Sequence, residues 1–168
     1  QHTERQRAEP HAEHHRRHRQ RCQALVRRQH GTNDTRGAHD DGVVAAGERT
    51  AVDTSTLWAA TSTGRVFIST NADAEPASAV AFRRLDGRAT NDPGRFVSGV
   101  HGDPANPNRA WVSYSGFDAA TPTTPGHVFE VTYNPVTGTA TWVDRSYDMG
   151  DMPITDVQWV LGHASLAT

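Results

Sequence analysis

The sequence predicts an all-β fold made of a repeated set of short strands. From Thr50 onward, apolar residues occur in short runs rich in β-branched and aromatic side chains, separated by turn-forming Gly, Pro, Asn and Asp. No stretch shows convincing helical periodicity. The runs also form two sets whose members match each other in order. We therefore expect two copies of one antiparallel unit.

The expected strands follow in order along the chain. The first set has three, separated by the turn 62–64 and the polar loop 71–78: 56–61, 65–70 and 79–85. The second set begins after Asp92-Pro93-Gly94 and has four: 95–101, 109–115, 126–133 and 139–144. Pro and Asn cluster at 103–108, where fixed φ angles and side-chain hydrogen bonds to the backbone favour chain reversal.

The two sets align through their large side chains. Trp111 lies 53 residues after Trp58, and a glycine-led strand follows each of them. Four strands repeating at about 50 residues are the signature of a propeller blade. We expect one blade at about 50–95, a second at 96–152 and the start of a third at 153. The residues that mark the repeat are expected in blade cores and turns: Trp58, Phe67, Phe82, Trp111, Phe129, Gly138 and Trp142.

Residues 1–49 differ in composition from the rest of the chain. Seven of the ten histidines precede Asp40, whereas all four Trp, all three Tyr and all five Phe follow Thr50. Such a segment has too little apolar surface to offset the entropy of ordering, so we expect a disordered low-complexity head. Its patternless Arg, His and Gln also fit GC-rich DNA translated in the wrong frame, and we favour that origin.

Two other interpretations of the head stay open. Metal binding is one, because four imidazoles would share one face of a helix: His11, His14, His15 and His18. A basic nucleic-acid arm is the other, although the head lacks aromatic residues for base stacking. Elsewhere, no apolar run is long enough to span a bilayer, and a single cysteine, Cys22, excludes an internal disulfide. We expect no cofactor, metal, nucleic acid or membrane to be involved.

Four segments of the body carry a family resemblance: 97–100, 103–112, 126–129 and the hairpin 134–142. They resemble the Asp-box (BNR) propeller repeats of sialidases, xyloglucanase-type glycoside hydrolases and sortilin-like receptors. An Asp-box runs Ser-x-Asp-x-Gly-x-Thr-Trp, with its Asp bracing a hairpin and its Trp packing between blades. Both boxes here are degenerate. One runs from Asn134 to Trp142 with an additional residue after Gly138, and the other runs from Ser69 to Phe82 with a long insertion.

The resemblance implies a secreted protein larger than this chain. In such repeats the strand at 154–157 would continue into an acidic turn and a further strand, which are missing after Gln158. We therefore expect truncation or a frame change near Gln158, with 160–168 as a truncated tail. The partners expected from the resemblance are the remaining propeller blades and a glycan or an extracellular protein.

No catalytic residue is assigned from the sequence. Sialidase chemistry needs an arginine cluster, a tyrosine and an acid, and the body offers Arg65, Arg83, Arg84, Arg95, Tyr114 and Asp118. It lacks a Phe-Arg-Ile-Pro motif, which 82–85 echoes only faintly. Glycoside hydrolysis needs two carboxylates about 5 to 10 Å apart. Loop carboxylates are present at Asp118, Asp148, Asp151 and Asp156, but such residues also form turns.

The loop 116–125 is the candidate binding surface, because it is inserted relative to the first set and repeat proteins tend to place insertions on their functional face. The candidate binding residues are Asp118, Thr121, Thr123, Thr124 and His127. The function expected is a non-catalytic glycan- or protein-binding or scaffold segment of a secreted propeller. The alternative is part of a propeller glycoside hydrolase whose catalytic residues lie mainly on missing blades.

Overall fold

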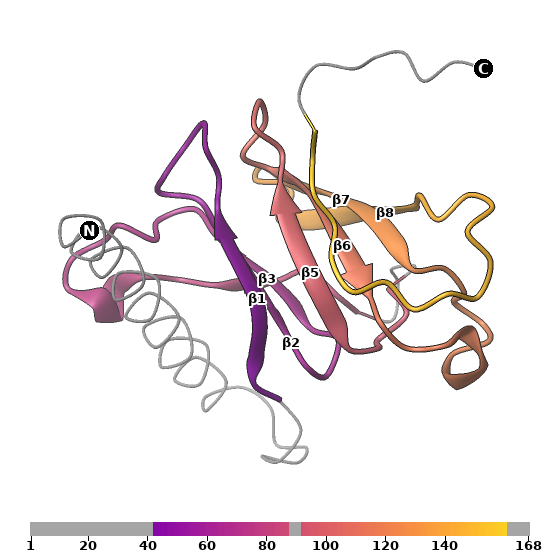
Figure 1. Cartoon of the computed structure of the whole chain (residues 1–168). Coiled ribbons are helices and arrows are strands. Elements are labelled where there is room, and N and C mark those ends of the chain that lie inside the picture. Colours follow the sequence, from indigo (N-terminus) through magenta and orange to yellow (C-terminus); the bar gives the residue numbers. More distant parts are fainter. Residues whose placement is uncertain (1–41, 88–91, 161–168) are drawn as a thin grey trace, which may run out of the picture.

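The computed structural model describes residues 42–87 and 92–160, so the expectations for the rest of the head and for 161–168 lie outside it. The described chain is all-β, as predicted, and forms two four-stranded antiparallel sheets (Figure 1). The N-terminal sheet comprises β1 (Val44–Arg49), β2 (Leu57–Thr61), β3 (Val66–Ser69) and β4 (Arg83–Arg84). The C-terminal sheet comprises β5 (Val97–Gly102), β6 (Arg109–Tyr114), β7 (Val128–Asn134) and β8 (Thr139–Asp144).

The first strand begins earlier than expected. The sequence was interpreted as a disordered head up to residue 49, and that boundary is wrong because β1 occupies Val44–Arg49. The segment lacks the alternation of a half-buried strand, and five of its residues gain order by pairing with β2. This strand supplies the fourth member of the first set, for which the sequence indicated only three.

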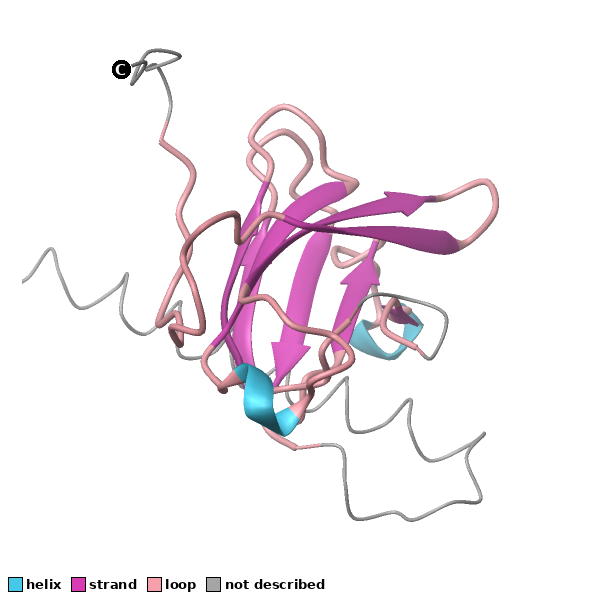
Figure 2. Ribbon diagram, turned by 90° about the vertical axis from the view of Figure 1, so that its right-hand side faces the viewer, coloured by secondary structure: helices cyan, strands magenta, loops and turns pink. Residues whose placement is uncertain are grey.

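The third expected strand, 79–85, is mostly not a strand. Only Arg83–Arg84 pairs with β3, and the short 3-10 helix η1 (Ala77–Ala79) precedes it. The side chain of Asn71 replaces a strand partner here. Its amide nitrogen donates to the Ala79 carbonyl at 3.0 Å, and its oxygen accepts from the Ala81 N–H at 2.9 Å. Figure 2 shows the two short helices in loops outside the sheets; the second is η2 (Asp118–Ala120).

The two sheets have the same register. Glu48 on β1 faces Trp58, and 53 residues later His101 on β5 faces Trp111. An irregularity interrupts the β1–β2 ladder between Val44 and Ala46, and another interrupts β5–β6 at the equivalent place, between Val97 and Gly99. The match extends to the later strands. Phe67 pairs with Ala59, and Phe129 pairs with Val112 at the equivalent place. The sequence alignment of the two sets also matches Phe67 with Phe129.

The sheets pack face to face, with β1 beside β5 and both running in the same direction (Figure 1). One cluster of buried side chains fills the space between them, including Trp58 and Ile68 from one sheet and Val112 and Phe129 from the other. Two indoles also bridge the sheets. Trp58 donates its ring N–H to the Pro107 carbonyl at 2.9 Å, and Trp142 donates to the Leu85 carbonyl at 3.3 Å.

The segment 153–159 runs along the other face of the C-terminal sheet as extended chain and is not assigned as a strand. The Ile154 N–H donates to the Tyr114 carbonyl at 3.1 Å, and the Ser98 hydroxyl donates to the Ile154 carbonyl at 2.6 Å. Farther along, Trp159 stacks on Trp111 with ring centroids 4.6 Å apart. No helix among residues 42–87 and 92–160 has the length and apolar character needed to cross a bilayer.

Candidate functional site

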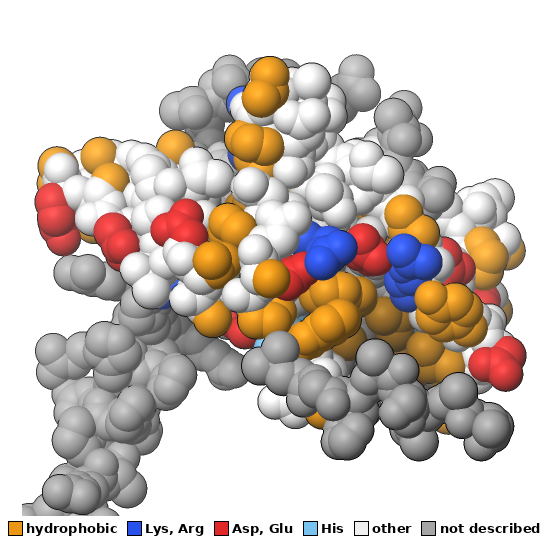
Figure 3. All heavy atoms as spheres, turned by 90° about the horizontal axis from the view of Figure 1, so that it is seen from above, with side chains coloured by type: hydrophobic (Ala, Val, Ile, Leu, Met, Phe, Trp, Pro, Cys, Tyr) orange, Lys and Arg blue, Asp and Glu red, His pale blue; other side chains and the backbone are white. Residues whose placement is uncertain are grey.

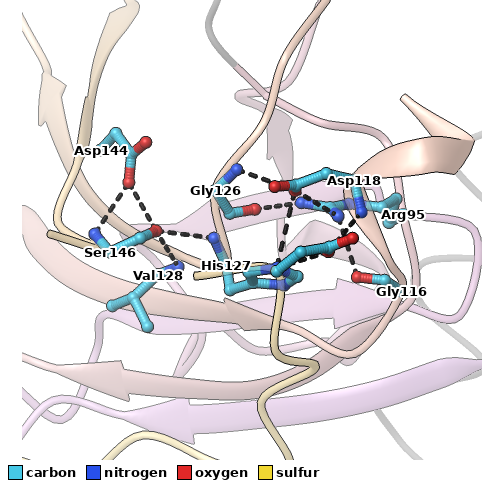
Figure 4. Close-up of polar contacts among 9 residues, drawn as sticks. Arg95, Gly116, Asp118, Gly126, His127, Val128, Asp144 and Ser146 are labelled. Atoms are coloured by element: carbon cyan, nitrogen blue, oxygen red, sulfur yellow. Dashed lines mark hydrogen bonds and ion pairs between the residues drawn. The ribbon is translucent and has the colours of Figure 1, made fainter. Parts of the chain in front are cut away.

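Three loops meet at one end of the C-terminal sheet. Because its strands are antiparallel, the start of β5, the end of β6, the start of β7 and the end of β8 lie at the same end. The loops attached there are 92–96, 115–127 and 145–152, and together we call them the loop end. It contains both the inserted loop that the sequence singled out and a network of buried polar groups (Figure 4).

Arg95 is the centre of that network. Its side chain is 3% exposed and forms an ion pair with Asp118, with Nη1 2.9 Å from Oδ1. The guanidinium also donates to the carbonyl oxygens of Gly116, at 2.8 Å, and Gly126. A buried guanidinium needs such compensation, because an unpaired charge away from water is strongly unfavourable. Arg95 therefore fixes both ends of the inserted loop to the segment that precedes β5.

His127 lies beneath that loop and is fully buried. Its Nε2 atom is 3.2 Å from Oδ1 of Asp151 and 3.6 Å from Oδ1 of Asp118. Asp151 Oδ1 also accepts the Asp118 N–H at 2.7 Å. The two carboxylates, from different loops, thus converge on one imidazole nitrogen.

Ser146 holds the third loop against β7. Its hydroxyl accepts from the N–H groups of His127, at 2.6 Å, and Val128, at 3.1 Å, and it donates to Asp144 Oδ1 at 2.6 Å. Gly126 fits beside this carboxylate only because it has no side chain: it lies at φ +102°, and a Cβ there would be 2.5 Å from Asp144 Oδ2. The backbone around His127 is therefore fixed from both sides.

Asp92, which is half-buried, and Tyr114, which is fully buried, form a further hydrogen-bonded pair at the same end. The tyrosine hydroxyl donates to Asp92 Oδ1 at 2.8 Å. Burial raises the pKa of Asp92, against the opposing effect of hydrogen bonds from the Gly94 N–H and Tyr114. Burial, followed by the nearby charge of Asp92, raises the pKa of Tyr114 well above its usual value. Tyr114 is fully buried, so its hydroxyl does not reach a bound molecule and this pair is structural.

Asp118, His127 and Asp151 lie close enough to be tested as a metal site, since one ligand atom of each lies within 4.8 Å of the others. Two features disfavour a metal. Asp118 Oδ1 already accepts from Arg95 and from the Gly126 N–H at 3.0 Å. A metal on Nε2 would also move the ring proton to Nδ1, a buried atom without a hydrogen-bond partner among the described residues. Metal-binding histidines almost always donate that proton to a partner.

A ring proton on Nε2 fits better, because that proton then points at Asp151 and the buried Nδ1 needs no acceptor. Full burial also keeps His127 from touching a bound molecule, as general acid–base catalysis would require. The side chains of Asp118 and Asp151 are 27% and 44% exposed, so only the carboxylates of this cluster reach the surface. The cluster holds loops in place.

The structure brings together two of the five binding residues named from the sequence, Asp118 and His127. The three threonines lie in the inserted loop: Thr123 is exposed, and Thr121 and Thr124 form a turn in which the Thr124 N–H donates to the Thr121 carbonyl at 3.0 Å. Thr121 is joined to the cluster through the backbone, because its N–H donates to the Asp118 carbonyl at 2.9 Å. His127 is an internal residue rather than a surface ligand.

The sequence did not point to the joint action of Arg95, Asp151 and Ser146. The sequence offers Arg95 and Asp151 only as residue types that catalysis could use, and it gives Ser146 no predicted role. The arginines weighed for sialidase chemistry do not converge: Arg83 donates to the Gly138 carbonyl at 3.3 Å, Arg84 pairs with Asp86, and Arg95 is buried at the loop end. A local signal existed for Ser146, because an Asp two residues before a Ser often forms a side-chain turn.

Comparisons with known proteins assign no function to this site, so its interpretation depends on the geometry described above. No protein family model, no curated protein and no solved structure matches this chain.

Proposed function

We propose that this chain forms two adjacent blades of an Asp-box-like β-propeller from a secreted protein, and that it binds a glycan or a protein without catalysing a reaction. The binding surface is the loop end. The remaining blades belong to a longer protein, and they pack on the outer face of the C-terminal sheet.

The repeated register supports the blade assignment. Trp58 and Trp111 hold equivalent positions, and so do the irregularities at the start of β1 and β5. Trp58 lies between the two sheets, whereas Trp111 lies on the outer face of the C-terminal sheet, where Trp159 and the Arg109 guanidinium contact it among the described residues. In a propeller each sheet packs on the next, so that outer face is where another blade would lie.

One of the two degenerate boxes also supports the assignment. In the β7–β8 turn, the side chain of Asn134 accepts from the N–H groups of Val136, at 2.9 Å, and Thr137, at 3.3 Å. Asn71 braces the segment before β4 differently, because its amide nitrogen donates to the Ala79 carbonyl and its oxygen accepts from the Ala81 N–H. Asn134 thus takes the bracing role of the Asp-box aspartate in its turn. Trp142 follows it and packs between the sheets, which is the place of the box tryptophan.

The observation that carries the non-catalytic part is the burial of His127. The strongest constellation of titratable groups in the described chain centres on an imidazole with no exposed surface, and its charged partners serve to join loops. Rigid loops above a buried polar network are suited to binding, because little conformational freedom is lost when a partner arrives. Figure 3 shows that hydrophobic side chains lie next to charged ones over the surface seen there.

One observation favours the enzyme alternative. The oxygens of Asp118 and Asp151 lie within 4.8 Å of each other, near the separation of about 5 Å that retaining glycosidases use. Against it, Asp118 is neutralised by Arg95, and both carboxylates point toward His127. A retaining mechanism needs one free nucleophile and one protonated acid that both reach the sugar.

A hydrolysis assay tests whether Asp118 and Asp151 form a catalytic pair in this chain. We expect the full chain, incubated with a panel of aryl glycosides that includes a sialoside, to release no aglycone above the buffer rate. A catalytic pair at these two aspartates predicts release that is lost in the Asp151→Asn variant. Release that depends on Asp151 would overturn the non-catalytic proposal.

A separate measurement tests the blade assignment. In sedimentation velocity, we expect the full chain to associate as its concentration rises, because the outer face around Trp111 lacks its neighbouring sheet. The Trp111→Glu variant should associate less, whereas Val136→Glu, an exposed change in the β7–β8 turn, should behave like the unmodified chain. A chain that stays monomeric at all concentrations would contradict an uncovered blade face.

A further inference from the structure

The loop end carries an unusual number of exposed large apolar side chains for loops that are so firmly held. Four of them lie there, with exposed fractions of 47%, 58%, 82% and 56%: Phe96, Phe117, Tyr147 and Met152. Scattered exposed apolar residues are normal, but a group of them on one surface marks an interaction site.

The polar network joins the loops that carry Phe96, Phe117 and Met152. The Asp118 N–H donates to Asp151 Oδ1. Phe117 immediately precedes Asp118 in the chain, and Met152 immediately follows Asp151. Phe96 follows Arg95, which binds the Gly116 carbonyl beside Phe117, and the Phe96 carbonyl itself accepts the Ser115 N–H at 3.1 Å. Three loops therefore present their apolar residues from fixed backbones. An arrangement fixed in advance lowers the entropy cost of binding.

Tyr147 adds a conformational argument. It is the non-glycine residue with positive φ in the described chain, at +48°, a conformation that costs a non-glycine residue about 1 kcal/mol or more. The ring is 82% exposed and does not pack in the core, and the Tyr147 side chain hydrogen-bonds the side chain of Arg145 at the surface. Such conformations cluster at binding sites, where they aim a side chain at a ligand.

The charge of this surface is negative. Asp148 is exposed and the side chain of Asp151 is 44% exposed. The two arginines of these loops are already paired: Arg95 is buried against Asp118, and Arg145 binds Glu130 at 2.9 Å. A partner with arginine or lysine beside its apolar groups complements this surface, whereas an acidic glycan or a nucleic acid does not.

We propose that the loop end, through Phe96, Phe117, Tyr147, Met152 and Asp148, docks a segment of a partner protein that carries arginine or lysine next to large apolar side chains. This inference rests on the proposed binding function. It favours a protein over a neutral sugar because Phe and Met offer no hydrogen bond to the hydroxyls of a sugar ring, whereas Phe, Tyr and Met are typical of protein interfaces.

Selection from a displayed library of random peptides tests the proposal. The full chain is immobilised, and we expect the enriched peptides to contain Arg or Lys beside Phe, Trp, Leu or Met. A synthetic peptide of the enriched sequence is then titrated by fluorescence anisotropy. Phe117→Ser should weaken its binding by about tenfold or more. Asp148→Lys should weaken binding and reduce its dependence on salt.

The matched control is Val136→Ser, which removes an apolar side chain that is 92% exposed at the opposite end of the sheet. We expect it to bind within about twofold of the unmodified chain, because it lies outside the docking surface. Phe117 and Asp148 are exposed, so circular dichroism should show unchanged folding in both variants.

The other outcomes separate the two proposals. Binding of neutral oligosaccharides on an array, lost in Phe117→Ser, would overturn the peptide partner and leave the binding function standing. Enriched peptides that are acidic, or that bind Phe117→Ser as well as the unmodified chain, would also overturn it. If neither peptides nor oligosaccharides bind, both proposals fall.

Discussion

Trp58 and Trp111 occupy the same register position in two equivalent hairpins, yet their surroundings differ. Trp58 is fully buried between the two sheets and its ring N–H is bonded to the Pro107 carbonyl. Trp111 is half-buried and lies on the outer face of the C-terminal sheet. Its ring stacks on Trp159, and the central carbon of the Arg109 guanidinium is 5.5 Å from the ring centroid. The repeat therefore places the two tryptophans at equivalent positions. Among the described residues, Trp58 packs against a neighbouring sheet and Trp111 does not.

The largest expected effect comes from removing each tryptophan in turn. Trp58→Ala should lower the free energy of unfolding by about 3–5 kcal/mol, because it leaves a cavity between the sheets and the Pro107 carbonyl without its donor. Trp111→Ala should cost about 1 kcal/mol, since the side chain is already half exposed. Urea denaturation of both variants measures this. Equal losses would mean that the outer face is as well packed as the inner one.

The turns at the two ends of the molecule give a second, smaller contrast. Gly64 lies at φ +86°, and a Cβ there would be 2.6 Å from the Arg95 carbonyl oxygen and against the backbone of Gly94. Gly138 lies at φ +69°, but its Cβ would meet only the flexible end of Arg83, 2.8 Å away. Gly64→Ala should therefore cost about 2 kcal/mol or more, because two backbones must separate, and Gly138→Ala about 1 kcal/mol.

Thermal unfolding of the two glycine variants checks this order. The reverse order would show that the approach of the 62–65 turn to the segment before β5 is loose. Because Gly64 belongs to the N-terminal sheet and Arg95 to the loop end, the same measurement also reports how firmly the two sheets are joined at that point.

Much of the fold could be predicted from the sequence because strand patterns are local. The alignment of Phe67 with Phe129 and of Trp58 with Trp111 corresponds to equal positions in the two ladders. What failed depends on partners far along the chain. β1 has no pattern of its own and is ordered by β2, and most of 79–85 bonds to the Asn71 side chain instead of to a strand.

The candidate site was predicted only in part for the same reason. The inserted loop was found from its length, but the role of His127 depends on Arg95 and Asp151, which lie in two other loops. No local spacing relates these three residues. His127 also illustrates the limit of residue type as evidence, because burial changes a titratable side chain from a ligand into a structural group.

The smallest expected effect concerns one aspartate in each of the two equivalent loops, β1–β2 and β5–β6. Hydrogen bonds from the Ser55 and Thr56 hydroxyls and the Ser55 N–H lower the pKa of Asp53. Burial works to raise the pKa of Asp103, but the Ala105 N–H and Arg109 outweigh it, and that pKa is lowered as well. A lowered folded-state pKa adds stability above the unfolded value of about 4, and this stability is lost as the pH falls through the folded value.

We therefore expect the free energy of unfolding to fall between pH 5 and pH 2, and to fall less in Asp53→Asn and in Asp103→Asn. The two loops should differ in salt. Asp103 depends partly on the charge of Arg109, which high salt screens, whereas Asp53 depends on neutral donors. Repeating the measurement in about 1 M NaCl should shrink the effect of Asp103→Asn and leave that of Asp53→Asn nearly unchanged. Equal shrinkage would show that the ion pair with Arg109 does not distinguish the two loops.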